Sequence, residues 1–252
     1  MIVEAVRKAA SRYVAGTDTD DAVEVASRLR REGYASTLAY WDSGDESVDD
    51  VLACYRRARE AADGVDAYLS VKATALDFSL EALRELASDR QRLHFDAMAP
   101  DTVDRTWALV DALPGTLGVT LPGRWRRSER DADWAAERGL AVRVVKGQWA
   151  GDDDREPREG FLAVVERLAG SAAYVAVASH DVDLASRALA RLREAGTPCG
   201  LEQLYGLRRS APPACIYIPY GHGWLPYALS NLRRRPRAAW WFARDLARAA
   251  LT

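Results

Sequence analysis

The residues best suited to chemistry in this chain lie at the ends of short apolar runs. The clearest case is Val142-Arg143-Val144-Val145-Lys146-Gly147, where a β-branched run carries two cations and ends in a glycine. A guanidinium inside an apolar strand needs a partner, and it can pair with an anion or stack on a ring. We therefore predict that Arg143 contacts a bound anion or an electron-poor ring.

Four other apolar runs also carry polar side chains where each run ends. They are Ser70-Val71-Lys72, His94-Phe95-Asp96, Ala178-Ser179-His180 and Ile216-Tyr217-Ile218-Pro219-Tyr220. In a parallel barrel, polar residues at the ends of separate strands together build one active site. The pattern therefore predicts an enzyme whose reactive groups are spread along the chain.

The segments that must position these residues alternate between strand-like and helix-like patterns. Strands are predicted at 36–41, 67–71, 93–96, 117–121, 141–146, 174–179, 199–204 and 215–218. Helices are predicted at 48–62, 79–88, 100–113, 132–138, 158–169, 182–195, 226–235 and 238–251, whereas 204–213 is too short for a full helix. Such alternation favours parallel strands joined by right-handed crossovers.

We predict a (βα)8 barrel that occupies residues 1–252 as a single domain, with 238–251 as an extra C-terminal helix. A doubly wound open sheet is the rival fold. The first predicted strand is not followed by the GxGxxG motif typical of dinucleotide-binding sheets. The barrel is therefore the preferred architecture.

Composition excludes several classes of protein. The 35 basic and 37 acidic residues give a net charge of −2, which argues against a nucleic-acid-binding protein. Three cysteines and three histidines without ligand spacing predict neither a disulfide framework nor a metal site. No apolar run is long enough to insert stably in a bilayer, and the first residues carry no signal-peptide core, so we expect a cytoplasmic protein.

Six of the strand-end segments, taken in order, resemble those of the proline dehydrogenases. They are Ser70-Val71-Lys72, Phe95-Asp96, Val142-Arg143-Val144-Val145-Lys146-Gly147, Ala178-Ser179-His180, Glu202-Gln203-Leu204-Tyr205-Gly206 and Tyr217-Ile218-Pro219-Tyr220-Gly221. That family consists of flavoenzymes on a (βα)8 barrel that oxidise proline to pyrroline-5-carboxylate. The resemblance covers residues 12–236 and implies bound FAD with its ring system over the barrel mouth.

The resemblance also implies a role for individual residues. Arg143 corresponds to an arginine beside the flavin N5 edge, and the other implied cofactor contacts are Lys146, Gly147, Trp149, His180 and Gln203. Lys72 and Asp96 correspond to a charged pair on the substrate side. The implied catalytic set is Lys72, Asp96, Tyr217 and Tyr227, and Leu204 joins both tyrosines in lining the substrate pocket.

Several of these residues also have a purely structural interpretation. Lys72 and Asp96 could form a buried salt bridge with no chemical role. His180 could be a core histidine that caps a helix, and Asp181 is predicted to cap the helix that follows it. His94 shares a strand face with Asp96 and is assigned a structural role.

The last predicted barrel helix departs from the family pattern. The family binds the proline carboxylate with two adjacent arginines, but here Ser230 and Asn231 occupy those positions. Arg233, about one helical turn beyond Ser230, either substitutes for them or is a solvated charge. The loss of charge-assisted hydrogen bonds predicts weak binding of free proline.

We therefore predict an FAD-dependent dehydrogenase or oxidase that converts an amine to an imine. Its substrate would be a small amine other than free proline, such as a proline analogue or a carrier-bound prolyl group. A genuine L-proline dehydrogenase and a non-catalytic barrel scaffold are the alternatives. The electron acceptor, whether a quinone, oxygen or another compound, and the oligomeric state stay open at this point.

Overall fold

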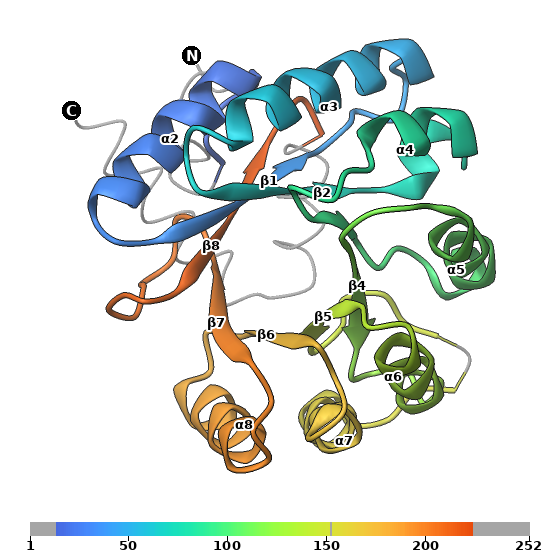
Figure 1. Cartoon of the computed structure of the whole chain (residues 1–252), viewed down its shortest axis with the longest axis vertical. Coiled ribbons are helices and arrows are strands. Elements are labelled where there is room, and N and C mark those ends of the chain that lie inside the picture. The colour runs from blue at the N-terminus through green and yellow to red at the C-terminus, as the bar shows by residue number, and fades with distance from the viewer. Residues whose placement is uncertain (1–13, 152, 224–252) are drawn as a thin grey trace, which may run out of the picture.

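A computed structural model describes residues 14–151 and 153–223, and it forms a closed barrel of eight parallel strands in sequential order (Figure 1). This confirms the predicted (βα)8 architecture and excludes the open sheet. The strands are β1 (Ala35–Tyr40), β2 (Ala67–Val71), β3 (Leu93–Phe95), β4 (Leu117–Pro122), β5 (Ala141–Val145), β6 (Tyr174–Ala178), β7 (Cys199–Leu204) and β8 (Cys215–Tyr220). Each pairs with its neighbours in sequence, and β8 closes the ring on β1.

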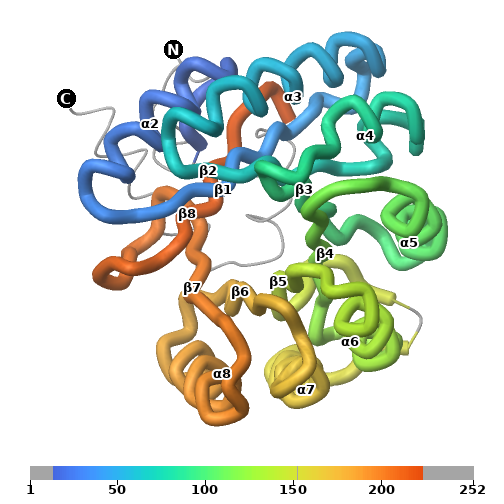
Figure 2. The backbone as a smooth tube through the Cα atoms, in the orientation of Figure 1, coloured from blue at the N-terminus to red at the C-terminus, as the bar shows by residue number. Residues whose placement is uncertain are grey.

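Helices surround this ring of strands (Figure 2). They are α2 (Thr19–Arg31), α3 (Val48–Ala62), α4 (Leu80–Leu86), α5 (Val103–Ala112), α6 (Ser128–Glu137), α7 (Pro157–Leu168) and α8 (Val182–Glu194), with 3-10 turns at Ala73–Leu76 and Pro100–Thr102. The helix α2, whose buried face packs on β8 and β1, was not predicted from the sequence. The predicted helices at 226–235 and 238–251, and hence the full extent of the domain, lie outside the described residues.

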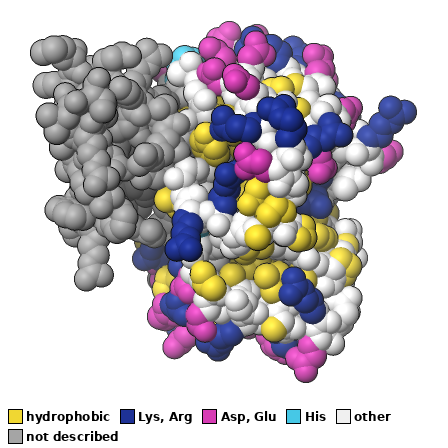
Figure 3. Space-filling view, turned by 90° about the vertical axis from the view of Figure 1, so that its left-hand side faces the viewer, with side chains coloured by type: hydrophobic (Ala, Val, Ile, Leu, Met, Phe, Trp, Pro, Cys, Tyr) yellow, Lys and Arg dark blue, Asp and Glu magenta, His cyan; other side chains and the backbone are white. Residues whose placement is uncertain are grey.

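The connection from β7 to β8 has no helix, as the short segment 204–213 predicts. A loop follows the outside of the barrel there, held by the Tyr34 hydroxyl, which donates to the Ser210 carbonyl at 2.8 Å. Without a helix, the outward residues Cys199 and Leu201 are only partly buried, and Leu207 is 40% exposed. Figure 3 shows apolar side chains in the middle of this face, with charged side chains above and below.

The barrel interior is unusually polar. Most barrels of this type fill their interior with valine, isoleucine and leucine. Here the interior side chains hydrogen bond or form ion pairs across the barrel. They include the partly buried Tyr68 and the buried Thr37, His94, Thr120, Arg143 and Glu202. Gly118 makes room for this polar core, because a Cβ atom there would lie 2.4 Å from Nδ1 of His94.

The tightest backbone contact lies between α7 and the turn after β4. A Cβ atom on Gly160 would lie 1.8 Å from the carbonyl oxygen of Gly123, so neither segment can accept a side chain without moving. Overpacking of this kind costs about 1–3 kcal/mol or more, and we expect Gly160→Ala to lower the free energy of unfolding by about 3 kcal/mol. Urea denaturation measures the loss.

Gly64→Ala is the matched control for this substitution. The nearest atom to a Cβ atom on Gly64 is the Ala61 carbonyl oxygen at 3.6 Å, which is an ordinary contact. We expect its free energy of unfolding to stay within about 1 kcal/mol of the unsubstituted protein. Equal losses for the two variants would contradict the proposed backbone clash.

Candidate active site

Arg143, on β5, is the centre of the interior network. Its Nη1 donates to Asp96 Oδ1 at 2.7 Å and to Ser70 Oγ at 3.1 Å, and its Nη2 donates to the Tyr68 hydroxyl at 3.1 Å. Its Nε lies 3.0 Å from Glu202 Oε1. The barrel itself therefore supplies the anions that pair with Arg143, so an apolar strand containing arginine does not by itself require an external anion or ring.

The charge of Arg143 is stabilised by these partners although the residue is only 2% exposed. Burial disfavours the cation, but the carboxylate of Glu202, with Tyr68 and the carboxylate of Asp96, holds the pKa of Arg143 well above its usual value. Arg143 is consequently a permanent cation directly below the barrel mouth.

Glu202, on β7, is a site residue that the sequence analysis did not single out. Its Oε2 accepts a hydrogen bond from the Tyr68 hydroxyl at 2.8 Å, and its Oε1 accepts one from Thr37 Oγ1 at 3.2 Å. The side chain is almost fully buried. An acidic residue two positions before Leu204, on the same face of the strand, was the available signal.

Asp96 and Tyr217 complete the upper part of the network. The Tyr217 hydroxyl donates to Asp96 Oδ2 at 2.7 Å, and Trp41 Nε1 donates to that hydroxyl at 3.5 Å. Burial, together with the nearby Asp96 carboxylate, raises the pKa of Tyr217 well above its usual value, so the phenol stays neutral. Three predicted site residues, Arg143, Asp96 and Tyr217, are thus brought together from β5, the end of β3 and β8.

The predicted pairing of Lys72 with Asp96 is wrong. Lys72 Nζ lies 2.8 Å from Asp42 Oδ1, beyond the end of β1, and both side chains are largely buried. The two oxygens of Asp96 already accept hydrogen bonds from Arg143, Ser70 and Tyr217. Asp42 is therefore a second residue at the mouth that sequence reasoning missed.

The end of β5 presents a cation at the mouth. The Lys146 side chain is 39% exposed, and its Nζ lies 3.8 Å from Asp181 Oδ2. Asp181 accepts a hydrogen bond from the Leu184 N–H at 3.2 Å, which confirms it as the N-cap of α8. Gly147 has a φ of +97°, a left-handed conformation that favours glycine, and Trp149 lies close by in sequence and is partly exposed.

His180 and Gln203 lie at the β6 and β7 ends in different orientations. Nε2 of His180 accepts a hydrogen bond from the Leu204 N–H at 2.9 Å and so links the two strand ends. The side chain of Gln203 instead accepts from the Ser210 N–H at 2.7 Å, in the loop outside the barrel. The cofactor contact predicted for Gln203 is wrong, because Glu202 and Leu204 take the inward face and the residue between them must point outward.

The remaining predicted substrate residues are only partly covered by the structure. Leu204 is partly exposed at the end of β7. Tyr227, Ser230, Asn231 and Arg233 lie outside the described residues, so their predicted roles stay predictions.

Two histidines, the buried His94 and the partly buried His180, make the free energy of unfolding depend on pH. Burial, assisted by the cation of Arg143, lowers the pKa of His94 well below its usual value. Burial is also the main cause of the lowered pKa of His180. Because both pKa values are lower in the folded than in the unfolded chain, the unfolded chain binds more protons below about pH 6.5. The contribution of the neutral histidines to the free energy of unfolding is therefore fully present above that pH and is lost as the pH drops.

We expect the free energy of unfolding to fall by up to about 1.4 kcal/mol per pH unit for each of these histidines as the pH drops below about 6.5. His94→Gln should remove one of the two contributions and leave a shallower pH dependence. Urea denaturation at a series of pH values measures both slopes. Identical slopes for His94→Gln and the unsubstituted protein would contradict the role assigned to His94.

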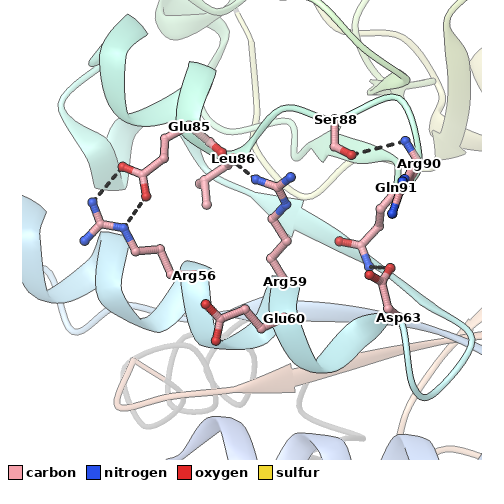
Figure 4. A pocket seen from close by; sticks show the side chains of 9 residues that line it. All are labelled: Arg56, Arg59, Glu60, Asp63, Glu85, Leu86, Ser88, Arg90 and Gln91. Atoms are coloured by element: carbon pink, nitrogen blue, oxygen red, sulfur yellow. Dashed lines mark hydrogen bonds and ion pairs between the residues drawn. The ribbon is translucent and has the colours of Figure 1, made fainter.

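A concave area away from the barrel mouth lies on the outer surface, between α3 and the segment 85–91 (Figure 4). Arg56 forms a two-point ion pair with Glu85, and Arg59 donates to the Glu85 carbonyl. Gln91 donates to Asp63 at 3.4 Å. Because these groups satisfy one another, we assign the area to packing of α3 against α4.

Within residues 14–151 and 153–223, no cluster of three or more histidine, cysteine or acidic side chains could hold a metal ion. No helix in the same ranges has the length and apolar character needed to cross a bilayer.

Comparison with known proteins points to one family. No family model matches the chain. Proline dehydrogenase 1 of Bacillus subtilis subsp. natto is 24% identical over 268 residues, covering 92% of this chain and 89% of that protein. Proline dehydrogenase of Deinococcus radiodurans is 24% identical over 272 residues, covering 91% of this chain and 87% of its own length.

Solved structures with the same fold include two proline utilization A (PutA) proteins. PutA from Bdellovibrio bacteriovorus, inactivated by N-propargylglycine, matches with a TM-score of 0.73 at 18% identity over 88% of this chain. PutA from Corynebacterium freiburgense matches with a TM-score of 0.71 at 17% identity over 96% of this chain. In both cases the match spans 32% of the longer PutA chain. The barrel is therefore a recurrent architecture within larger proteins.

Proposed function

We propose, from the relationship of this chain to the proline dehydrogenases, that it is an FAD-dependent dehydrogenase that oxidises a carbon next to nitrogen. The observation that supports this most directly is the cluster of Arg143, Asp96 and Tyr217 immediately below the barrel mouth. Active sites of (βα)8 barrels form at this end of the strands. The family resemblance assigns site roles to the same three residues.

The residues at the end of β5 fit an anionic, aromatic cofactor such as FAD. Lys146 offers a partly exposed cation suited to a phosphate, and Trp149 offers a partly exposed aromatic ring. Arg143 and His180 would complete the cofactor contacts. When bound, FAD supplies the two-electron acceptor that the oxidation requires.

The side chains of the chain itself would orient the amine and keep water out. The hydroxyl of Tyr217 is held by Asp96 and Trp41, so its ring has a fixed position from which to press on an aliphatic substrate. The Lys72–Asp42 ion pair at the rim offers a carboxylate that would hold the proton of a substrate ammonium group. Leu204 would contribute an apolar wall.

We propose that the preferred substrate is an amine other than free proline. Ser230 and Asn231 at the positions of the carboxylate-binding arginines support this proposal. A small amine without a free carboxylate would lose little binding free energy when serine and asparagine replace the two arginines. Genuine L-proline dehydrogenase activity is the second candidate, favoured by the similarity to proline dehydrogenases over about nine tenths of the chain.

A substrate screen under anaerobic conditions tests these proposals. We expect the purified protein to bind FAD near a 1:1 ratio and to lose flavin absorbance with a secondary amine or prolyl ester faster than with L-proline. Fastest bleaching by L-proline would favour the second candidate. A protein that stays colourless after reconstitution with FAD would contradict both and favour a non-catalytic scaffold.

A further inference from the structure

We propose that Glu202 is a positioning residue that holds Arg143 inside the barrel and limits the positive charge that Arg143 presents to the bound cofactor. This inference rests on the proposed function, since it concerns the cofactor at the barrel mouth. It assigns a role to a residue on β7 that touches neither the substrate nor the cofactor in the proposed site.

The contacts of Glu202 tie together three distant strands. Its carboxylate lies 3.0 Å from Nε of Arg143 on β5 and accepts hydrogen bonds from Tyr68 on β2 and Thr37 on β1. Tyr68 in turn accepts a hydrogen bond from Nη2 of Arg143. Glu202 therefore fixes the inner edge of the guanidinium directly and, through Tyr68, indirectly, while Asp96 binds its other end.

The same contacts place more than one negative charge against Arg143. Two carboxylates, Asp96 and Glu202, face the single guanidinium of Arg143. Arg92 is the neighbouring cation, and its Cζ lies 4.6 Å from the centre of the Tyr68 ring and 4.8 Å from that of Tyr174. It therefore stacks between two rings rather than pairing with either carboxylate in the described contacts. The carboxylate of Asp96 alone would neutralise the charge of Arg143. Glu202 therefore adds a further negative charge beside it.

The negative charge of Glu202 affects how readily the cofactor is reduced. A reduced flavin is electron-rich, so positive charge near the ring favours its reduction and negative charge opposes it. Charges in a buried, low-dielectric site interact more strongly than in water. Glu202 should therefore make the cofactor harder to reduce than Arg143 paired with Asp96 alone would allow.

Glu202→Gln tests the inference because glutamine keeps the shape of the side chain and one oxygen acceptor while it removes the charge. Tyr68 and Thr37 donate to different oxygens of Glu202, so the variant keeps one of these two hydrogen bonds. Tyr68→Phe removes a hydrogen bond to Glu202 and leaves its charge. Glu166→Gln is the matched control, since Glu166 pairs with Arg191 on the outer helices. The measurement is the ratio of reduced to oxidised FAD in each holoenzyme, equilibrated with a reference dye at one potential.

We expect Glu202→Gln to raise this ratio at least tenfold, equivalent to about 30 mV for a two-electron couple. Glu166→Gln should change it less than twofold, and Tyr68→Phe should change it less than Glu202→Gln does. A purely structural role would leave the potential of a folded Glu202→Gln protein unchanged. An unchanged or lowered ratio therefore overturns the inference.

A second measurement separates failure of this inference from failure of the proposed function. If the unsubstituted protein binds no FAD, the proposed function and the proposed effect of Glu202 on the cofactor are both contradicted. A double-mutant cycle of Glu202→Gln and Arg143→Met in FAD-free protein then tests the pairing alone. We expect a coupling of at least fivefold in the unfolding equilibrium constant, and additive effects overturn the pairing.

Discussion

Arg143→Met is expected to lower the free energy of unfolding by about 3–5 kcal/mol and to abolish reduction of the cofactor by substrate. The substitution removes the cation that pairs with both Asp96 and Glu202 and leaves two carboxylates in the barrel interior. Removing one partner of a buried ion pair is costly, because the remaining charge keeps its desolvation penalty. Urea denaturation of FAD-free protein measures the first effect, and anaerobic bleaching measures the second.

A control variant separates the loss of a buried cation from the loss of an exposed one. Arg191→Met, which removes a solvent-screened ion pair with Glu166, serves as the control and should lower the free energy of unfolding far less than Arg143→Met does. A loss below about 1 kcal/mol for Arg143→Met would contradict the central role of this residue.

Ser230→Arg combined with Asn231→Arg is expected to raise kcat/KM for L-proline by about 100-fold to 10,000-fold. Each new charge-assisted hydrogen bond to the carboxylate is worth about 1.5–3 kcal/mol, and each 1.4 kcal/mol corresponds to about tenfold. Steady-state oxidation of L-proline measures the gain. The expectation follows from the family resemblance of the last predicted helix, which lies outside the described residues.

Two controls distinguish carboxylate recognition from a general change in the pocket. Pyrrolidine has the ring of proline without the carboxylate, so its kcat/KM should not rise in the double variant. Ser230→Met combined with Asn231→Met adds bulk without charge and should not improve L-proline oxidation. An unchanged kcat/KM for L-proline in the arginine variant would contradict the explanation that these two positions determine the substrate preference.

Much of the architecture was predictable from local pattern. Short β-branched runs alternate with amphipathic segments, and this alternation is enough to predict parallel strands and crossover helices. The strand at Ala67–Val71 and the helix at Val48–Ala62 have the predicted bounds. The helix α2 was not predicted although it is amphipathic, because it precedes β1 and so lies outside the alternation of strands and helices on which the prediction rests.

The sequence by itself determined which residue types stand at the strand ends, and it selected Arg143, Asp96, Tyr217, Lys146 and His180. Only the tertiary structure decided how they pair. Barrel strands are buried on both faces and read as continuous apolar runs, so the sequence does not say which alternate residues point inward. For that reason Gln203 was assigned to the mouth and Glu202 was overlooked. The partner of Lys72 likewise depends on the three-dimensional arrangement. Asp96 already pairs with Arg143 and Tyr217, whereas Asp42 Oδ1 lies 2.8 Å from Lys72 Nζ.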